Sequence, residues 1–411
     1  MNYAGLIKIF KENSHILFTQ IVDKLYYFVF WTLLARTFLP ETYGSIIIVF
    51  TFTNLMATLF GFGLPIHIQR KAALNLQKGN EGLTSIFSAN LLLSIPFSIV
   101  SIIIFTVVYP SSSLESILLL LVLFAFTSNE LMLTGILKGQ QKYPTIFSIT
   151  VICRSITIAA FFIVYLFWNN GFGIIYLFLA GNFLFLIVLL IVSGQYPEAF
   201  RFSNIKFGNF IKLIVLVFPL WLATVFNFLY DRVDVFLISK LVSIEQLSIY
   251  SIAYGVMKSS TIAFSFMLVG GLTKAASYSG DKVMMRNFIV KYSKLFLVIS
   301  SLILVILFAF ADFLLIFLYT DKYSESALIL RVLAFAIIPL SLNNLTGIAL
   351  NGAGMYKENL YVTIAGFLFN LTANLIVIPV YGIIGAAFVT IVTEIIILTG
   401  DIAIIKNKGL A

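Results

Sequence analysis

The chain has 411 residues, of which 61% are hydrophobic and 10% are charged, and its formal net charge is +9. Apolar runs of about 20 residues recur from end to end, and each is long enough to cross the hydrocarbon core of a bilayer. This composition excludes a soluble domain and predicts an all-α integral membrane protein. The basic residues lie in short loops between the runs, which excludes nucleic acid as a partner. The single cysteine, Cys153, excludes an intramolecular disulfide and most metal frameworks.

The apolar runs predict about twelve transmembrane helices. Lys8 and Lys11 precede a first run with the length of a full span, so we expect a retained anchor and not a cleaved signal peptide. Lys and Arg gather in one set of connections, whereas the other set carries only Arg36, Lys240 and Lys322. The positive-inside rule then places both termini in the cytoplasm. The predicted spans lie near 15–38, 43–65, 85–109, 114–136, 144–167, 171–193, 213–238, 246–270, 292–318, 327–350, 360–380 and 383–404.

The second half of the sequence repeats features of the first half. The segment LTGILKGQQKY (133–143) resembles LTGIALNGAGMY (345–356). We therefore predict two six-helix bundles, 1–200 and 201–411, that insert in the same direction as a parallel repeat. Secondary transporters with such repeats have their site between the halves, near the bilayer midplane. An offset of 204 residues pairs Tyr26 with Tyr230, Arg36 with Lys240, Glu41 with Glu245 and Arg70 with Lys274.

Charged residues interrupt the seventh span. Asp231, Arg232 and Asp234 lie in an otherwise apolar stretch, where each charge costs about 2.5–3.5 kcal/mol on insertion scales. Asn227, Asp231 and Asp234 share one helical face, because they are spaced i, i+4, i+7. Two interpretations remain open: an ion pair that locks two helices together, or the lining of a polar path for a charged substrate.

Other predicted spans carry charges and aromatic residues as well. We predict a cavity with a cationic patch that binds an anionic head group such as a phosphate. Both the planar guanidinium group of Arg and the ammonium group of Lys bind phosphate. The acids are candidates for pairing with these cations or for coupling to H⁺ or Na⁺. The aromatic residues are candidates for stacking on sugar rings, or they are ordinary interface aromatics. The cations are Lys24, Arg154, Arg232 and Lys258; the acids are Asp23, Glu130, Asp231, Asp234 and Glu394; the aromatic residues are Tyr27, Trp31 and Tyr254.

The sequence contains none of the common catalytic or nucleotide-binding motifs. It has no GxxxxGK[ST] loop, no HExxH, no GxSxG and no Cys/His cluster. We therefore expect a protein that is not an enzyme and that binds no cofactor or metal.

Three segments resemble the polysaccharide-unit flippases (O-antigen type, Wzx-like) of the MOP exporter superfamily: LARTFLPETYGS (34–45), LYDRVDVFLISKLVSIEQLSIYSIAY (229–254) and YGIIGAAFVTIVTE (381–394). Ser248 is a departure, since these proteins often have Gly there. The resemblance implies a MATE-like fold of two six-helix bundles. It implies alternating-access flipping of polyprenyl-diphosphate-linked oligosaccharide repeat units across the bacterial inner membrane, for O-antigen or capsule assembly alongside the polymerase machinery. It also implies that Asp231, Arg232 and Asp234 line the cavity from the seventh helix, with Lys24 on the matching first helix.

Three alternatives remain. A multidrug or cation exporter of the same superfamily would favour an acid-dominated cavity, whereas the predicted spans here hold nearly as many bases as acids. A membrane-embedded polysaccharide polymerase or ligase would carry a large external loop with catalytic basic residues, and the predicted external loops are tiny. A lipid II flippase of the superfamily would have two more spans.

Overall fold

The computed structural model describes residues 3–74, 83–195, 207–264, 271–278 and 280–410, and these residues are almost entirely helical. The all-α prediction is therefore confirmed. The chain forms two compact units. We call Phe18–Thr37 with Ser45–Phe228 the N-terminal unit, and Met1–Leu17 with Phe38–Gly44 and Leu229–Ala411 the C-terminal unit. The predicted domain boundary at 200/201 lies outside the described residues.

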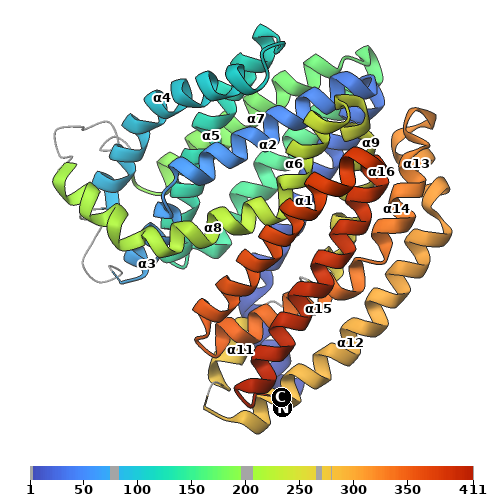
Figure 1. The fold of residues 1–411 in the computed structure, drawn as a ribbon. Coiled ribbons are helices and arrows are strands. Elements are labelled where there is room, and N and C mark those ends of the chain that lie inside the picture. Colours follow the sequence, from blue (N-terminus) through green and yellow to red (C-terminus); the bar gives the residue numbers. More distant parts are fainter. Residues whose placement is uncertain (1–2, 75–82, 196–206, 265–270, 279, 411) are drawn as a thin grey trace. The chain divides into compact units, whose positions relative to one another are not determined.

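The helices of the N-terminal unit pack around α5, which contacts α3, α4, α6 and α7 (Figure 1). Glycines allow the close approach of α3 to α5: a Cβ at Gly135 would lie 2.7 Å from the carbonyl oxygen of Pro65. The unit contains the second part of α1 (Tyr3–Thr37), most of α2 (Pro40–Phe60), α3 (Leu64–Leu74), α4 (Leu83–Val108), α5 (Leu114–Gly139), α6 (Tyr143–Trp168), α7 (Gly171–Val192) and the first part of α8 (Phe207–Leu241).

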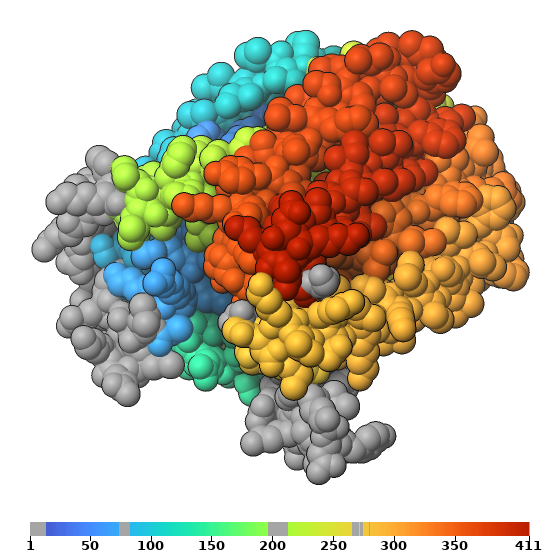
Figure 2. All heavy atoms as spheres, turned by 60° about the horizontal axis from the view of Figure 1, so that its bottom comes forward, coloured from blue at the N-terminus to red at the C-terminus, as the bar shows by residue number. Residues whose placement is uncertain are grey.

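The C-terminal unit is built around α15, which packs against α16, α12 and α11. In Figure 2 the side chains of α12, in yellow-orange, form one outer face of this unit. Val298 and Leu302 of α12 are 68% and 60% exposed. Exposed apolar side chains on a long helix are typical of a surface that faces lipid. Besides the end of α8, the unit contains α9 (Ile244–Ser260), α11 (Gly271–Ser277), α12 (Lys282–Ala309), α13 (Ala311–Tyr319), the 3₁₀-helix η3 (Asp321–Tyr323), α14 (Ser326–Ala334), α15 (Ile337–Gly352) and α16 (Tyr356–Asn407).

Each of the twelve predicted spans begins on a helix. Within the described residues, eight helices are long and apolar enough to cross a membrane, and α14 with α15 forms a ninth candidate that is bent by 48°. The long helix α16 carries two predicted spans, because its backbone breaks at Gly382 with φ 57° and ψ −143°. α1 carries the first predicted span. The predicted span 246–270 begins on α9, and its last residues, 265–270, lie outside the described part of the chain.

The structure adds breaks that the hydropathy did not predict. The predicted span 43–65 ends early, at Phe60, and the short helix α3 follows a turn at residues 61–63. The predicted span 292–318 is divided at Phe310, which separates α12 from α13. Apolar composition continues through both breaks, so composition alone could not reveal them.

Candidate functional site

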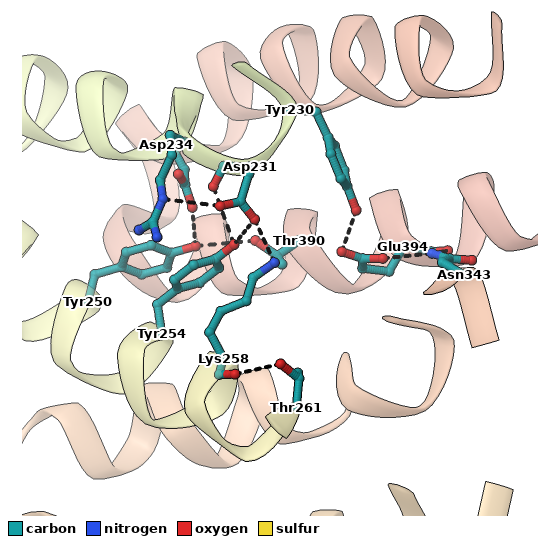
Figure 3. Close-up of polar contacts among 11 residues, drawn as sticks. Tyr230, Asp231, Asp234, Tyr250, Tyr254, Lys258, Thr261, Asn343, Thr390 and Glu394 are labelled. Atoms are coloured by element: carbon teal, nitrogen blue, oxygen red, sulfur yellow. Dashed lines mark hydrogen bonds and ion pairs between the residues drawn. The ribbon is translucent and has the colours of Figure 1, made fainter. Parts of the chain in front are cut away.

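The end of α8 and the start of α9 form a hairpin that aligns polar residues of the two helices. The Ser243 hydroxyl caps α9 by accepting the Gln246 N–H at 3.0 Å, and Glu245 lies in the first turn, where the helix dipole favours an acid. Tyr250, Tyr254 and Lys258 then follow at intervals of four residues along one face of α9. Figure 3 shows this face turned towards Asp234 and Asp231 on α8.

Asp231 joins two cations and a tyrosine. Its carboxylate accepts hydrogen bonds from Lys258 Nζ at 2.5 Å and from the Tyr254 hydroxyl at 2.8 Å, and Arg232 Nε lies 3.1 Å away. Both cations also lie 5.3 Å from the centre of the Tyr254 ring. The side chains of Asp231, Lys258 and Arg232 are 31%, 28% and 38% exposed. These charges are therefore paired but accessible, and we call Asp231, Arg232, Tyr254 and Lys258 the outer cluster.

Asp234 lies deeper, with 5% of its surface exposed. One carboxylate oxygen accepts the N–H of Val235 at 2.8 Å, and the other accepts the Tyr250 hydroxyl at 2.5 Å. The Tyr250 oxygen in turn lies 3.2 Å from Thr390 Oγ1 on α16. The direct hydrogen-bond partners of Asp234 in the described part of the chain are thus uncharged.

Glu394 connects α16 to α8 and α15. It is 4% exposed; the Tyr230 hydroxyl donates to one carboxylate oxygen, and Asn343 Nδ2 donates to the other at 2.6 Å. Asn343 Nδ2 also lies 2.9 Å from the Glu394 carbonyl oxygen. Like Asp234, Glu394 has neutral partners for both of its side-chain oxygens.

The N-terminal unit contains a separate charged cluster around Arg154, which is 1% exposed. Its guanidinium donates to Asp23 at 3.2 Å, to Glu130 at 3.3 Å and to Asn182 Oδ1 at 2.9 Å. The same group lies 4.3 Å from the ring centre of Tyr26. Arg154 therefore links α1, α5, α6 and α7 through a buried network, which we call the Arg154 cluster.

The internal repeat is visible in these contacts. Tyr26 and Tyr230, which are related by the offset of 204, each bond to a polar side chain on a later helix of the same unit. Asn182 Nδ2 on α7 donates to the Tyr26 hydroxyl at 3.2 Å, and the Tyr230 hydroxyl donates to Glu394 on α16. The two units thus share a tyrosine at corresponding positions but differ in the charge of its partner.

The predicted site residues therefore fall into two groups, one in each unit. The structure brings Arg232 and Lys258 together at Asp231, and it surrounds Arg154 with Asp23 and Glu130. Their predicted roles towards substrate or coupling ion stay predictions. Lys24 is half-buried on α1, next to Asp23 in the sequence.

The aromatic candidates for sugar stacking lie in different surroundings. Tyr27 is 38% exposed and packs edge-on against Tyr26, with ring centres 5.3 Å apart. Trp31 lies edge-on to Phe50 at 4.9 Å. Tyr254 is 5% exposed and belongs to the outer cluster. Stacking on sugar stays a prediction for all three.

The sequence of this chain matches known protein families. The sequence model of a family described as "Polysaccharide biosynthesis protein" matches residues 9–270. The chain belongs to this family. A second family model, MatE, matches residues 219–376. The resemblance that the sequence motifs indicated is therefore confirmed.

Relatives of this family member include an uncharacterized membrane protein of Methanocaldococcus jannaschii, which is 32% identical over 112 residues. That match spans 27% of this chain and 27% of the relative. The capsular polysaccharide biosynthesis protein CapF of Staphylococcus aureus is 21% identical over 392 residues, which cover 94% of this chain and 97% of CapF.

Solved structures show the same fold. An inward-facing multidrug resistance MATE family transporter of the MOP superfamily has a TM-score of 0.74 and 13% identity, with 96% of this chain and 98% of that chain covered. The lipid II flippase MurJ in an inward closed conformation has a TM-score of 0.73 and 18% identity, covering 96% and 89%. This chain is therefore a multi-pass membrane protein with the fold of the MOP superfamily, and the predicted fold class is confirmed.

Sequence reasoning missed several members of these networks. Asn182 and Thr390 supply contacts to Arg154 and Tyr250. Asn182 is a lone polar residue in a long apolar run, and Thr390 is a polar residue in an apolar run that also holds Thr393 and Glu394. Such a residue in a predicted span is the only signal that could have indicated them. Among the residues that the structure describes, no three His, Cys, Asp or Glu side chains are arranged to hold a metal ion.

Proposed function

We propose that this protein is a flippase that moves polyprenyl-diphosphate-linked oligosaccharide repeat units across the bacterial inner membrane, for assembly of a surface polysaccharide such as O-antigen or capsule. The observation that carries the proposal is the family match over residues 9–270. The likeness to CapF along 94% of the chain supports it, as does the fold shared with MurJ and MATE transporters. We place both termini in the cytoplasm, in accord with the distribution of Lys and Arg over the loops.

The outer cluster is suited to a diphosphate. Arg232 and Lys258 are both partly exposed, and both are held by the single carboxylate of Asp231. Phosphate oxygens form strong charge-assisted hydrogen bonds with guanidinium and ammonium groups. A diphosphate can therefore replace Asp231 as the partner of the two cations. Neither cation is then left without a counter-charge, which is the costly state for a desolvated ion.

This exchange of partners offers a route to ion coupling. When a diphosphate takes Arg232 and Lys258, the Asp231 carboxylate loses both of its cations and needs a new positive charge. A proton or a sodium ion would supply it, and the release of substrate would expel that ion again. The proposed coupling to H⁺ or Na⁺ would therefore use the shared carboxylate of Asp231.

Alternating access completes the proposed mechanism. The head group enters from the cytoplasmic side while the lipid tail remains in the bilayer, and a rocking motion of the two units opens the site outward. An inside-negative potential assists export of an anion by up to about 2.3 kcal/mol per charge and 100 mV.

A genetic test addresses the substrate directly. In a host that lacks this chain, we expect complete lipid-linked repeat units to accumulate on the cytoplasmic leaflet and surface polymer to be lost. The wild-type chain and the control Arg331→Ala, which removes a cation from the partly exposed pair with Asp312, are expected to restore polymer. The double variant Arg232→Ala/Lys258→Ala is expected to fold but to restore none.

Two results would contradict the proposal. Normal surface polymer together with new sensitivity to cationic compounds would favour a cation exporter. Single units that reach the outer leaflet and stay unpolymerised would favour a polymerase.

A specific observation keeps the cation exporter as the second candidate. The MatE model matches residues 219–376, and the clusters at the end of α8 hold three acids against two cations. The acids are Asp231, Asp234 and Glu394. Full restoration of polymer by the double variant would show that the two cations are dispensable and would overturn the diphosphate role of the outer cluster. Normal polymer in the host that lacks this chain, with new sensitivity to cationic compounds, would favour the cation exporter.

A further inference from the structure

A buried acid on α16, Asp401, lies outside the clusters described above. It is 1% exposed. It follows Glu394 by seven residues, so both acids lie on one face of the helix, about 10.5 Å apart along its axis. On α15, Thr346 follows Asn343 by three residues and contacts Asp401, as Asn343 contacts Glu394. The seam between α15 and α16 therefore holds a polar contact at each acid, in addition to the hydrogen bond between Asn359 and Asn351.

The hydrogen bonds at Thr346 indicate which protonation state fits Asp401. Thr346 Oγ1 lies 2.6 Å from Asp401 Oδ2 and 3.2 Å from the carbonyl oxygen of Asn343. A hydroxyl group has one proton to donate. If Asp401 is ionised, both neighbours are acceptors and one contact lacks a proton. If Oδ2 is protonated, Asp401 donates to Thr346, Thr346 donates to Asn343, and each contact has its own proton.

The second oxygen of Asp401 supports the same state. Oδ1 is buried and has no hydrogen-bond partner among the described residues. A carboxylate with a bare buried oxygen is far more costly than a neutral carboxyl group in the same place. Glu394 differs, since Tyr230 and Asn343 each donate to one of its oxygens. The surroundings of Glu394 thus suit an anion, and those of Asp401 suit a neutral acid.

No cation on the helices packed against α16 pairs with Asp401 in the part of the chain that the structure describes. α15 has no charged residue along its whole length. The charged residue of α14, Arg331, pairs with Asp312, and Lys258 on α9 pairs with Asp231. Lys408 Nζ, beyond the end of α16, lies 3.7 Å from Glu358. The other charged or titratable residues of these helices are Glu245, Tyr250 and Tyr254 on α9, and Tyr356, Lys357, Tyr361, Tyr381, Glu394 and Lys406 on α16.

We propose that Asp401 is a proton-binding site of the C-terminal unit and that it carries a proton in this conformation. Loss of that proton leaves a carboxylate whose Oδ2 competes with the Asn343 carbonyl for the Thr346 hydroxyl proton and whose Oδ1 has no donor among the described residues. To supply donors, α15 and α16 must separate enough to admit water. Proton binding at Asp401 therefore favours the closed seam. A role for this proton in coupling rests on the flippase function proposed above, whereas its presence does not.

Infrared spectroscopy of the purified protein in lipid tests the proton without any substrate. We expect a carbonyl-stretch band of a buried neutral carboxyl group at neutral pH, which Asp401→Asn removes. The controls Glu394→Gln and Asp312→Asn are expected to retain it; the Asp312 side chain is 58% exposed. Thr346→Val removes the hydroxyl and is expected to shift the band. A band that neither Asp401→Asn nor Thr346→Val changes would overturn the proposal, as would a band that is lost in Glu394→Gln.

A second experiment tests the coupling role. In cells that lack the native chain, Asp401→Asn is expected to lower surface polymer severalfold, and Asp312→Asn is expected to restore it. Full polymer with Asp401→Asn would overturn the coupling role even where the infrared band is lost. If the wild-type chain itself moves no lipid-linked sugar, the proposed function fails, and the infrared result still decides whether Asp401 binds a proton.

Discussion

Replacing Arg154 by alanine tests whether the Arg154 cluster holds the N-terminal unit together. The change removes a cation that is 1% exposed and leaves Asp23, Glu130 and Asn182 without their shared partner. Removal of one member of a buried ion pair costs about 3–5 kcal/mol, mainly because the remaining charge is desolvated and unpaired. The Asp23 and Glu130 side chains are 37% and 24% exposed, so we expect a value of about 3 kcal/mol, at the lower end of that range.

The chain offers its own reporter for this measurement. Cys153 is the only cysteine in the sequence, is 4% exposed and precedes Arg154 on α6. A thiol-reactive dye that fluoresces on coupling will report unfolding during heating, and Arg154→Ala is expected to react at a lower temperature than wild type. Arg331→Ala is the matched control, because it breaks a pair with Asp312 that is partly exposed, at a cost of about 0–1 kcal/mol.

A combined variant separates the loss of a partner from the loss of packing. Arg154→Met with Asp23→Asn and Glu130→Gln removes every charge of the cluster, so no unpaired ion remains. Since a buried ion pair is often replaced by neutral groups at little cost, most of the stability is expected to return. A melting curve of Arg154→Ala that coincides with wild type would refute the reasoning. Failure of the triple variant to recover would show that packing against rings such as Tyr26, and not charge, decides the stability.

Two further changes test the outer cluster and a turn. Asp231→Asn removes the carboxylate that holds Lys258, so its cations are free to bind a diphosphate. Inorganic pyrophosphate is therefore expected to raise the melting temperature of this variant more than that of wild type. An equal rise in both proteins would contradict the proposed exchange of partners. Gly63 has a φ of +69°, and the Cβ of Gly63→Ala would lie 3.1 Å from the backbone nitrogen of Trp221. We expect a lower melting temperature, because a side chain in the left-handed region costs about 1–2 kcal/mol and the close contact adds to that cost. Gly354→Ala, at φ +79° with no neighbour within 4 Å, is its control and should cost less.

Much of the helical architecture could be predicted from hydropathy, because each apolar run needs a helix to satisfy its backbone in a membrane. The break within α16 was also predictable, since Gly382 adopts a positive φ that suits glycine. The division at Phe310 was not, because phenylalanine is as apolar as its neighbours and the break depends on tertiary packing.

The contacts between α8 and α9 were predictable from the spacing of residues along each helix, whereas those around Arg154 were not. The spacing of Tyr250, Tyr254 and Lys258 on α9 placed them on one face, and the hairpin with α8 then brings that face to Asp231 and Asp234. Local spacing plus one short turn was sufficient there. The contact between Arg154 and Asp23 joins residues 131 apart in the sequence, and no local pattern specifies it. Asp401 gave no signal because its surroundings, and not its spacing, distinguish it from other acids near span ends.

The distribution of neutral and charged partners differs between the two units, and this difference bears on where a proton can act. Asp23 and Glu130 in the N-terminal unit both contact the Arg154 guanidinium, which keeps its charge at any physiological pH. The two carboxylates share this one positive charge, so protonation of either weakens an ion pair. In the C-terminal unit, Asp234 and Asp401 have only neutral hydrogen-bond partners among the described residues. A change of protonation there alters the charge of the buried site without breaking an ion pair, so we expect the coupling chemistry to reside in the C-terminal unit.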